Sequence, residues 1–232
     1  MSIRKTIRPF VKILLRKSHK VEVTYINVLP ELSGSCIFAA NHSCRYDGPI
    51  SLCALPNNTK VLAGKQRMAL IEKFGLFLVG TIWVDRKNKK SRNHIYEKMV
   101  GMLKSGVSLL IFPEGTWNLT PSLPMIPLYY GVVRMAKDTK LPIVPLIEEY
   151  RGERCFVKFG QPFYVGEELS KQEALQKLRD IMATLKWDIW ENFPIEKRSE
   201  TDDLEWEKEA RRRIEAFPEW DNEYESSMVR NE

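Results

Sequence analysis

Histidine and cysteine are scarce in this sequence of 232 residues, and the few that occur do not form ligand pairs. The four cysteines include no pair at C-x-x-C spacing; they are Cys36, Cys44, Cys53 and Cys155. Scattered thiols of this kind are typical of a reduced, cytosolic protein, and they disfavour both a disulfide framework and a zinc site. We therefore expect free thiols, no metal and no bound cofactor.

The sequence also lacks a long apolar run. Its longest candidate, 75–84, is well below the roughly 18 to 20 residues that cross a bilayer. The N-terminal apolar residues are interleaved with Lys and Arg and so do not form an export signal. The phosphate loops G-x-x-x-x-G-K-S/T and G-x-G-x-x-G are absent, which argues against a nucleotide-driven enzyme. Any membrane contact is expected to be peripheral, on the cytoplasmic face.

Charge of both signs is present but unevenly distributed. Residues 1–190 contain 29 Lys or Arg against 16 Asp or Glu, whereas 191–232 contain 7 against 14. A basic body attracts polyanions such as lipid phosphates or an acidic carrier protein. Nucleic-acid binding would depend on charge alone, so we do not expect it. The tail, 193–232, is predicted to be polar and acidic, with one helix near 202–216.

Residues 1–20 contain seven Lys or Arg and no acid, alternating with apolar side chains. From Pro9 onward this pattern predicts an amphipathic helix with a basic side that would lie in an anionic membrane surface. An ordinary helix that covers the core with a solvated basic face is the alternative.

Residues 21–192 alternate between apolar strand patterns and helical patterns, which indicates an α/β domain with a central mixed β-sheet flanked by helices. The expected strands are 21–26, 36–40, 60–64, 80–84, 107–112, 142–147 and 155–159. Helical spacing predicts a helix over 94–104 and a longer one from Ser170, where Ser170 and Glu173 form a capping box.

Of the three histidines, His42 is the candidate for proton transfer. His19 and His94 lie in polar surroundings typical of the surface. His42 directly follows the strand 36–40, at a strand end where active sites collect. Five residues later, Asp47 could orient the imidazole through a hydrogen bond. Alternatively, Asp47 could be the N-cap of a short helix, and both roles could hold together.

A second polar segment, FPEGTWN at 112–118, follows the strand 107–112. Its proline and glycine turn the chain, while Glu114 and Thr116 are displayed at the strand end. With these two segments, the sequence resembles the glycerolipid acyltransferase family, which carries a His-x4-Asp motif and a Phe-Pro-Glu-Gly-Thr motif in this order. GTIWVDR at 80–86 and LPIVP at 141–145 are similar to two further family motifs. The resemblance covers about residues 20–165.

The resemblance implies direct transfer of an acyl group from acyl-CoA or acyl carrier protein to a lysophospholipid hydroxyl. The expected acceptor is 1-acylglycerol 3-phosphate, for phospholipid biosynthesis. His42 would be the base and Asp47 its orienting acid. By analogy Arg86, Glu114 and Gly115 would place the acceptor's head group. Arg86 suits phosphate physically, whereas Glu114 would act indirectly by positioning Arg86 or a hydroxyl.

Other basic residues that could contact substrate are Lys65, Arg67 and Arg45, each of which could equally be surface charge. One departure concerns the third motif, where the family commonly continues with Arg and Ser and this chain has Trp117 and Asn118. Losing that cation weakens the expectation of a phosphomonoester acceptor.

Three alternatives stay open. A covalent route would use Cys44 or Ser43 as nucleophile with His42 as base, although no G-x-S-x-G elbow supports it. The chain could instead acylate another lipid or non-lipid hydroxyl. It could also be a catalytically inactive lipid-surface binding module of the same fold.

Overall fold

The computed structural model describes residues 21–44, 46–64, 81–85, 88–118, 120, 123–151 and 153–193. The described strands are β1 (Glu22–Tyr25), β2 (Ile37–Ala40), β3 (Lys60–Gly64), β4 (Ile82–Val84), β5 (Leu109–Ile111), β6 (Ile143–Arg151) and β7 (Arg154–Phe159). The described helices are α2 (Asp47–Ala54), α4 (Lys89–Lys104), α5 (Gly131–Thr139) and α6 (Lys171–Asn192).

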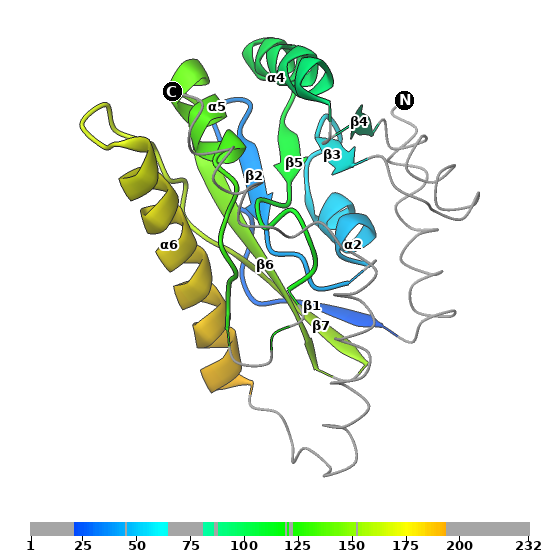
Figure 1. Ribbon diagram of the computed structural model, residues 1–232. Helices are drawn as coiled ribbons and strands as arrows, with labels where there is room; N and C mark the ends of the chain where they lie inside the picture. The colour runs from blue at the N-terminus through cyan, green and yellow to red at the C-terminus, as the bar shows by residue number, and fades with distance from the viewer. Residues whose placement is uncertain are drawn as a thin grey trace.

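The strands form one seven-stranded sheet in the order β1-β7-β6-β2-β5-β3-β4 (Figure 1). Every neighbouring pair is parallel except β6 and β7, which form an antiparallel hairpin. The sheet is therefore mixed, as predicted. Its central strand, β2, is fully buried along its length, as expected for a strand with parallel neighbours on both sides.

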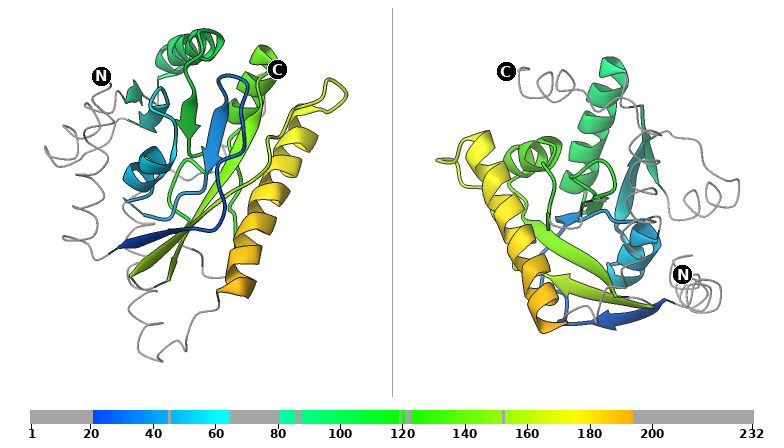
Figure 2. Two further views of the ribbon diagram at one scale, coloured as in Figure 1. Left: turned by 180° about the vertical axis from the view of Figure 1, so that it is seen from behind. Right: turned by 60° about the horizontal axis from the view of Figure 1, so that its bottom comes forward.

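Two apolar layers cover the two faces of the sheet, because side chains alternate along each strand. On one face, Ile37 and Ala39 of β2 pack in the cluster that includes the buried sides of α4, α5 and α6. On the other face, Phe38 and Ala40 pack in the cluster that includes α2. Figure 2 shows the long helix α6 and the shorter α2 on opposite sides of the sheet.

The predicted strands are all present, with ends that shift by a few residues, and β6 continues to Arg151, beyond the expected end at 147. The capping box of α6 is also present: the Ser170 hydroxyl accepts from the Glu173 amide, and the Glu173 carboxylate accepts from the Ser170 amide.

Two helix predictions need correction. The helix predicted over 94–104 begins at Lys89, because Asn88 caps it by accepting a hydrogen bond from the Ser91 amide at 3.1 Å. The patterns in the sequence also do not predict α5, a nine-residue helix.

Other predictions fall on parts of the chain outside the described residues. These are the amphipathic helix over 1–20, the strand residue at 80 and the helix near 202–216. Within the described part of the chain, no helix is both long and apolar enough to cross a membrane.

Candidate active site

The chain leaves the neighbouring strands β2 and β5 toward opposite faces of the sheet. After β2 it forms α2 on one face, and after β5 it reaches α5 on the other. Because β2 and β5 are parallel, the loops that follow them begin side by side at the same edge of the sheet and then diverge. Such a divergence at the carboxyl ends of strands forms the crevice where α/β proteins commonly bind ligands. The segment 41–44 and the segment 112–118 meet there.

The predicted contact between His42 and Asp47 is present. His42 Nδ1 lies 2.8 Å from Asp47 Oδ2. The aspartate side chain is fully buried, whereas the imidazole is 23% exposed. A buried carboxylate that accepts from Nδ1 leaves the lone pair of the neutral ring on Nε2. The arrangement therefore presents a proton acceptor to the crevice and keeps its orienting acid away from solvent.

The carboxylate of Asp47 turns back over the preceding loop. Its Oδ2 accepts from the backbone amides of Ser43 and Cys44, at 2.5 and 2.8 Å. Asp47 is the first residue of α2, and the N-cap position belongs to Tyr46, which makes no side-chain capping bond. The N-cap alternative for Asp47 is therefore wrong, since its oxygens are used upstream to close the His42 loop.

The segment after β5 holds His42 from several sides. Phe112 stacks on the imidazole with ring centroids 4.4 Å apart. Glu114 Oε1 accepts from the His42 backbone amide at 2.9 Å, and the Asn118 amide donates to the His42 carbonyl at 2.6 Å. The two motifs found in the sequence thus form one structural unit, in which the position of the imidazole depends on the 112–118 segment.

Glu114 lies wholly inside the protein. Its second oxygen, Oε2, accepts from the Ile126 amide at 3.1 Å, so both carboxylate oxygens hold backbone groups. Burial raises the pKa of the Glu114 carboxyl to about 7, although its backbone hydrogen bonds from His42 and Ile126 act in the opposite direction. Glu114 is therefore placed to hold the His42 loop in position. Its burial does not suit direct contact with a head group.

Gly115 and Thr116 complete the turn. Gly115 has a φ of +68°, and a Cβ at this position would lie 2.2 Å from a ring carbon of Tyr129. Only glycine satisfies both the backbone conformation and the close approach. Thr116 is half-buried. Gly115 therefore has a clear conformational role in shaping the turn.

Trp117 reaches the outer nitrogen of the histidine. Its indole Nε1–H donates to His42 Nε2 at 3.0 Å, and the two rings meet edge to face, with centroids 6.0 Å apart and planes at 83°. With Asp47 at Nδ1 and Trp117 at Nε2, both imidazole nitrogens have a partner.

Strand β6 supplies further residues that no pattern in the sequence predicts. The Tyr150 hydroxyl donates to Asp47 Oδ1 at 2.7 Å, and burial, followed by the Asp47 charge, raises the pKa of Tyr150 so that it remains a donor. Glu148 is buried beneath the site, and its carboxylate is hydrogen-bonded by Ser51. Burial, followed by Asp47, raises the pKa of Glu148 well above its usual value.

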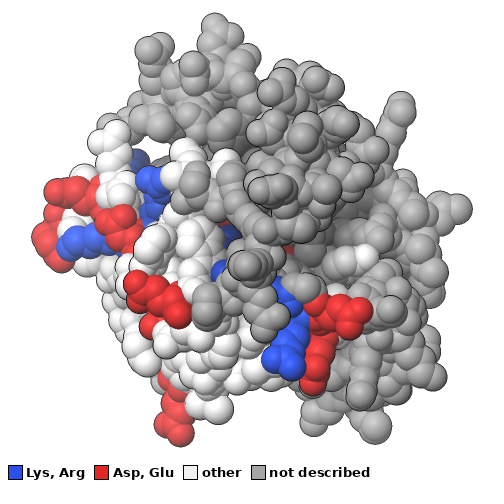
Figure 3. Space-filling view, turned by 90° about the horizontal axis from the view of Figure 1, so that it is seen from below, with Lys and Arg blue, Asp and Glu red and all other residues white. Residues whose placement is uncertain are grey.

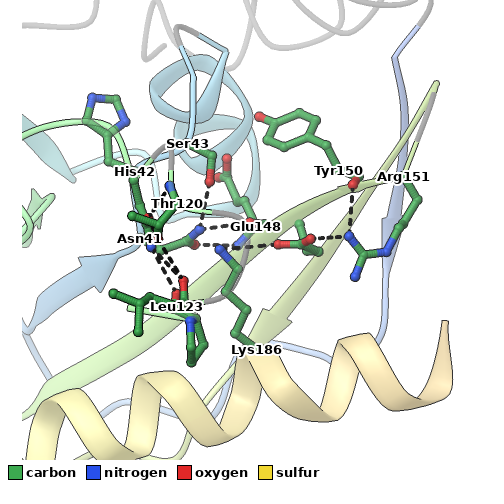
Figure 4. A network of polar contacts seen from close by, with 12 residues as sticks. Asn41, His42, Ser43, Thr120, Leu123, Glu148, Tyr150, Arg151 and Lys186 are labelled. Atoms are coloured by element: carbon green, nitrogen blue, oxygen red, sulfur yellow. Dashed lines mark hydrogen bonds and ion pairs between the residues drawn. The ribbon is translucent and has the colours of Figure 1, made fainter. Parts of the chain in front are cut away.

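Asn41, the residue before the histidine, fixes the start of the loop to β6. Its side-chain amide donates to the Glu148 carbonyl at 2.9 Å and accepts from the Glu148 backbone amide at 2.7 Å (Figure 4). It also donates to the Ser43 hydroxyl at 3.2 Å. In the sequence, the one indication that β6 contributes to the site is the pair Glu148 and Glu149, two acids at the end of an otherwise apolar strand pattern.

Cys44 is poorly suited to be a nucleophile. Its thiol lies 3.4 Å from Asp47 Oδ1, and burial, with the nearby Asp47 charge, raises the pKa of the thiol to about 12. The reactive thiolate is therefore rare at neutral pH. This disfavours the covalent route through Cys44.

Several predicted site residues lie outside the described residues: Arg86, Lys65, Arg67 and Arg45. The four cysteines all lie in the described part of the chain, and none of them forms a disulfide. In the described part of the chain, no group of three or more His, Cys, Asp or Glu side chains could hold a metal ion.

A histidine oriented by a buried aspartate, at the carboxyl edge of a mixed α/β sheet, is an arrangement that can accept and return a proton. Comparison with known proteins shows which family the chain belongs to. The model of the acyltransferase family matches residues 20–148, and the chain belongs to this family.

Curated relatives agree with this assignment. A 1-acyl-sn-glycerol-3-phosphate acyltransferase of Saccharomyces cerevisiae is 28% identical over 127 residues, which are 53% of this chain and 42% of that protein. An enzyme of the same name from Cocos nucifera is 32% identical over 114 residues, which are 48% of this chain and 36% of that protein. The chain thus spans less than half the length of these two relatives.

The fold also matches a solved structure, that of the 1-acyl-sn-glycerophosphate (LPA) acyltransferase PlsC from Thermotoga maritima. The TM-score is 0.62 at 17% sequence identity, and the match covers 84% of this chain and 83% of that one. This likeness confirms the predicted fold class.

Proposed function

We propose that the chain transfers a fatty acyl group from an acyl thioester to the free hydroxyl of a lysophospholipid, with 1-acylglycerol 3-phosphate as the acceptor. The observation that carries the proposal is the hydrogen bond between His42 Nδ1 and the buried Asp47 carboxylate, at the meeting point of two loops. The names of the matching relatives agree with the acceptor.

In this proposal His42 Nε2 removes the proton of the acceptor hydroxyl while its oxygen attacks the thioester carbonyl. The resulting imidazolium is stabilised by Asp47, whose charge is held in place by the Ser43 and Cys44 amides and the Tyr150 hydroxyl. When the carbon–sulfur bond breaks, the proton passes from His42 to the departing thiolate. The ester and a free thiol are the products, without a covalent acyl-enzyme.

Arg86 and Lys65 are proposed to bind the acceptor's phosphate, because a guanidinium offers paired donors to phosphate oxygens and an ammonium offers a positive charge. Glu114 would act indirectly, by holding the His42 backbone. Gly115 and Thr116 would shape the turn beside the reacting groups. The donor would be acyl-CoA or acyl carrier protein.

We further propose that the protein works at an anionic membrane surface, on the cytoplasmic side, through the basic residues 1–20. On the face shown in Figure 3, Lys and Arg side chains at the left and at the lower right lie against Asp and Glu side chains. Paired charges of this kind attract an anionic surface weakly. The N-terminal residues are therefore the better candidates for this contact.

The test of the proposed function compares the intact chain with His42→Ala, and uses His94→Ala as matched control because His94 is exposed on α4. Purified proteins are incubated with radiolabelled palmitoyl-CoA and 1-oleoyl-glycerol 3-phosphate, or with lysophosphatidylcholine or monoacylglycerol. We expect His42→Ala to lower kcat by about a hundred to ten thousand fold, and His94→Ala to match the wild type.

Equal rates for His42→Ala and wild type would refute the role of His42. Transfer to monoacylglycerol but not to the phosphate-bearing acceptor would refute the proposed substrate. Absence of transfer with every donor and acceptor, including acyl carrier protein as donor, would favour a binding module.

A further inference from the structure

The proton-accepting nitrogen of His42 is already occupied by Trp117. The imidazole is fixed in the tautomer that carries its hydrogen on Nδ1, since that nitrogen faces the Asp47 carboxylate at 2.8 Å. Nε2 then has a lone pair and no hydrogen. The indole N–H, which can only donate, lies 3.0 Å from this nitrogen. A hydroxyl that is to lose its proton to Nε2 must take the place of the indole.

We propose that Trp117 is a gating residue for the His42 base, which occupies Nε2 until the hydroxyl of an acceptor displaces it. The inference rests on the proposed function, because it takes His42 as the base of acyl transfer. It adds a residue that selects the nucleophile: only an acceptor that binds the site well enough to displace the indole gains access to the base.

The competing nucleophile is water. The imidazole is 23% exposed, so water can reach the crevice. With a thioester bound and Nε2 free, His42 would take a proton from water while the water oxygen attacked the carbonyl. The carbon–sulfur bond would break, and a fatty acid and a thiol would be released. Occupation of Nε2 by the indole disfavours this hydrolysis while the acceptor site is empty.

The anchoring of the surrounding backbone indicates how the gate would open. On one side of Trp117, Glu114 holds the His42 and Ile126 amides through its two oxygens. On the other side, the Asn118 amide donates to the His42 carbonyl at 2.6 Å. The loop is thus fixed on both sides of Trp117, so displacement of the indole involves rotation of the side chain with little movement of the loop.

The decisive variant is Trp117→Phe, which keeps an aromatic ring and removes the N–H donor. Trp187→Phe is the matched control, because Trp187 is exposed on α6 and its indole N–H bonds Glu191. The first measurement is thiol release from palmitoyl-CoA without acceptor. A neutral hydrogen bond contributes modestly to a free energy, so we expect hydrolysis by Trp117→Phe to rise about 2- to 10-fold. The control is expected to equal wild type.

The second measurement is the concentration of 1-oleoyl-glycerol 3-phosphate that gives half-maximal transfer. It should fall in Trp117→Phe by a similar factor, since the acceptor no longer competes with the indole. Adding His42→Ala to Trp117→Phe should abolish the extra hydrolysis. Unchanged hydrolysis in Trp117→Phe would overturn the gate while leaving the function of His42 intact. Raised, His42-dependent hydrolysis without transfer would support the gate and refute the proposed acceptor.

A third measurement does not depend on turnover. The indole ¹H–¹⁵N cross-peak that disappears in Trp117→Phe belongs to Trp117, one of six tryptophans. In the wild type it should move when His42 is replaced by Ala, and also at acid pH, where the imidazolium has no lone pair to accept the N–H. A cross-peak that is insensitive to both changes would overturn the gate, whatever the enzyme assays give.

Discussion

Replacing Glu114 with glutamine tests how the segment after β5 is fixed against the His42 loop. The carboxyl group is fully buried, and its two oxygens accept from the His42 and Ile126 amides. Glutamine has the same shape but never ionises, so it removes the charge and keeps one acceptor. The pH dependence of the difference in unfolding free energy between the two proteins therefore reports the ionisation of this buried carboxyl.

The magnitude follows from the pKa of the Glu114 carboxyl, which burial raises from 4.5 to about 7. The folded state therefore holds this proton more tightly than the unfolded state does. Its contribution to stability is full below pH 4.5 and is lost as the pH rises to about 7. Between pH 5 and pH 8 the wild type should lose about 2 to 3 kcal/mol that Glu114→Gln does not lose.

The assay is urea unfolding followed by circular dichroism at several pH values between 5 and 8. Glu148 and the other carboxyl groups titrate in both proteins, so their contributions largely cancel in the difference. We expect Glu114→Gln to gain stability relative to the wild type as the pH rises. Glu173→Gln is the control, because hydrogen bonds from Ser170 lower the pKa of this exposed carboxyl. Its contribution to stability is therefore already complete above pH 4.5, and the difference between wild type and Glu173→Gln should stay flat across this pH range.

The reasoning fails if the difference between wild type and Glu114→Gln stays constant from pH 5 to pH 8. It also fails if the wild type gains relative stability with rising pH. Either result would mean that the backbone donors outweigh burial and keep Glu114 ionised throughout this range.

Two further predictions concern the turn and strand β6. Gly115→Ala places a Cβ against Tyr129 at a positive φ, which should cost roughly 2 to 4 kcal/mol and lower the Tm by about 5 to 15 °C; a Tm within about 2 °C of wild type would contradict the required close approach. Tyr150→Phe removes the donor to Asp47 Oδ1 and should lower kcat about 10-fold. A kcat equal to that of the wild type would contradict a role for this donor in holding the Asp47 carboxylate.

The sequence predicts the central strands β2 and β5 well because each is an apolar run that is buried on both faces. It predicts helix ends less well. The start of α4 was missed because Lys89 and Lys90 continue a charged stretch, and only the hydrogen bond from Ser91 to Asn88 identifies the cap. The helix α5 was missed because nine residues contain little more than two turns of pattern.

In the site, contacts within one segment could be predicted from the sequence, and contacts between distant segments could not. The pairing of His42 with Asp47 is local, so a five-residue spacing was enough to predict it. The donors from β6 are not local: Tyr150 lies 103 residues from Asp47 along the chain. Their proximity depends on β6 lying beside β2 in the sheet. Strand order is set by the packing of helices on both faces, and no spacing within one segment reveals it.

The contacts of Glu114 indicate a structural role for the Phe-Pro-Glu-Gly-Thr segment. A glutamate in such a segment suggests a ligand for substrate, yet its carboxylate is buried and bonded to two backbone amides. Because β2 and β5 lead to opposite faces, the loops that follow them would diverge without a link between them. Glu114, Phe112 and the Asn118 amide provide that link, and all three contact His42. The segment therefore fixes the imidazole at the carboxyl edge of the sheet, and both carboxylate oxygens of Glu114 are used in holding backbone amides.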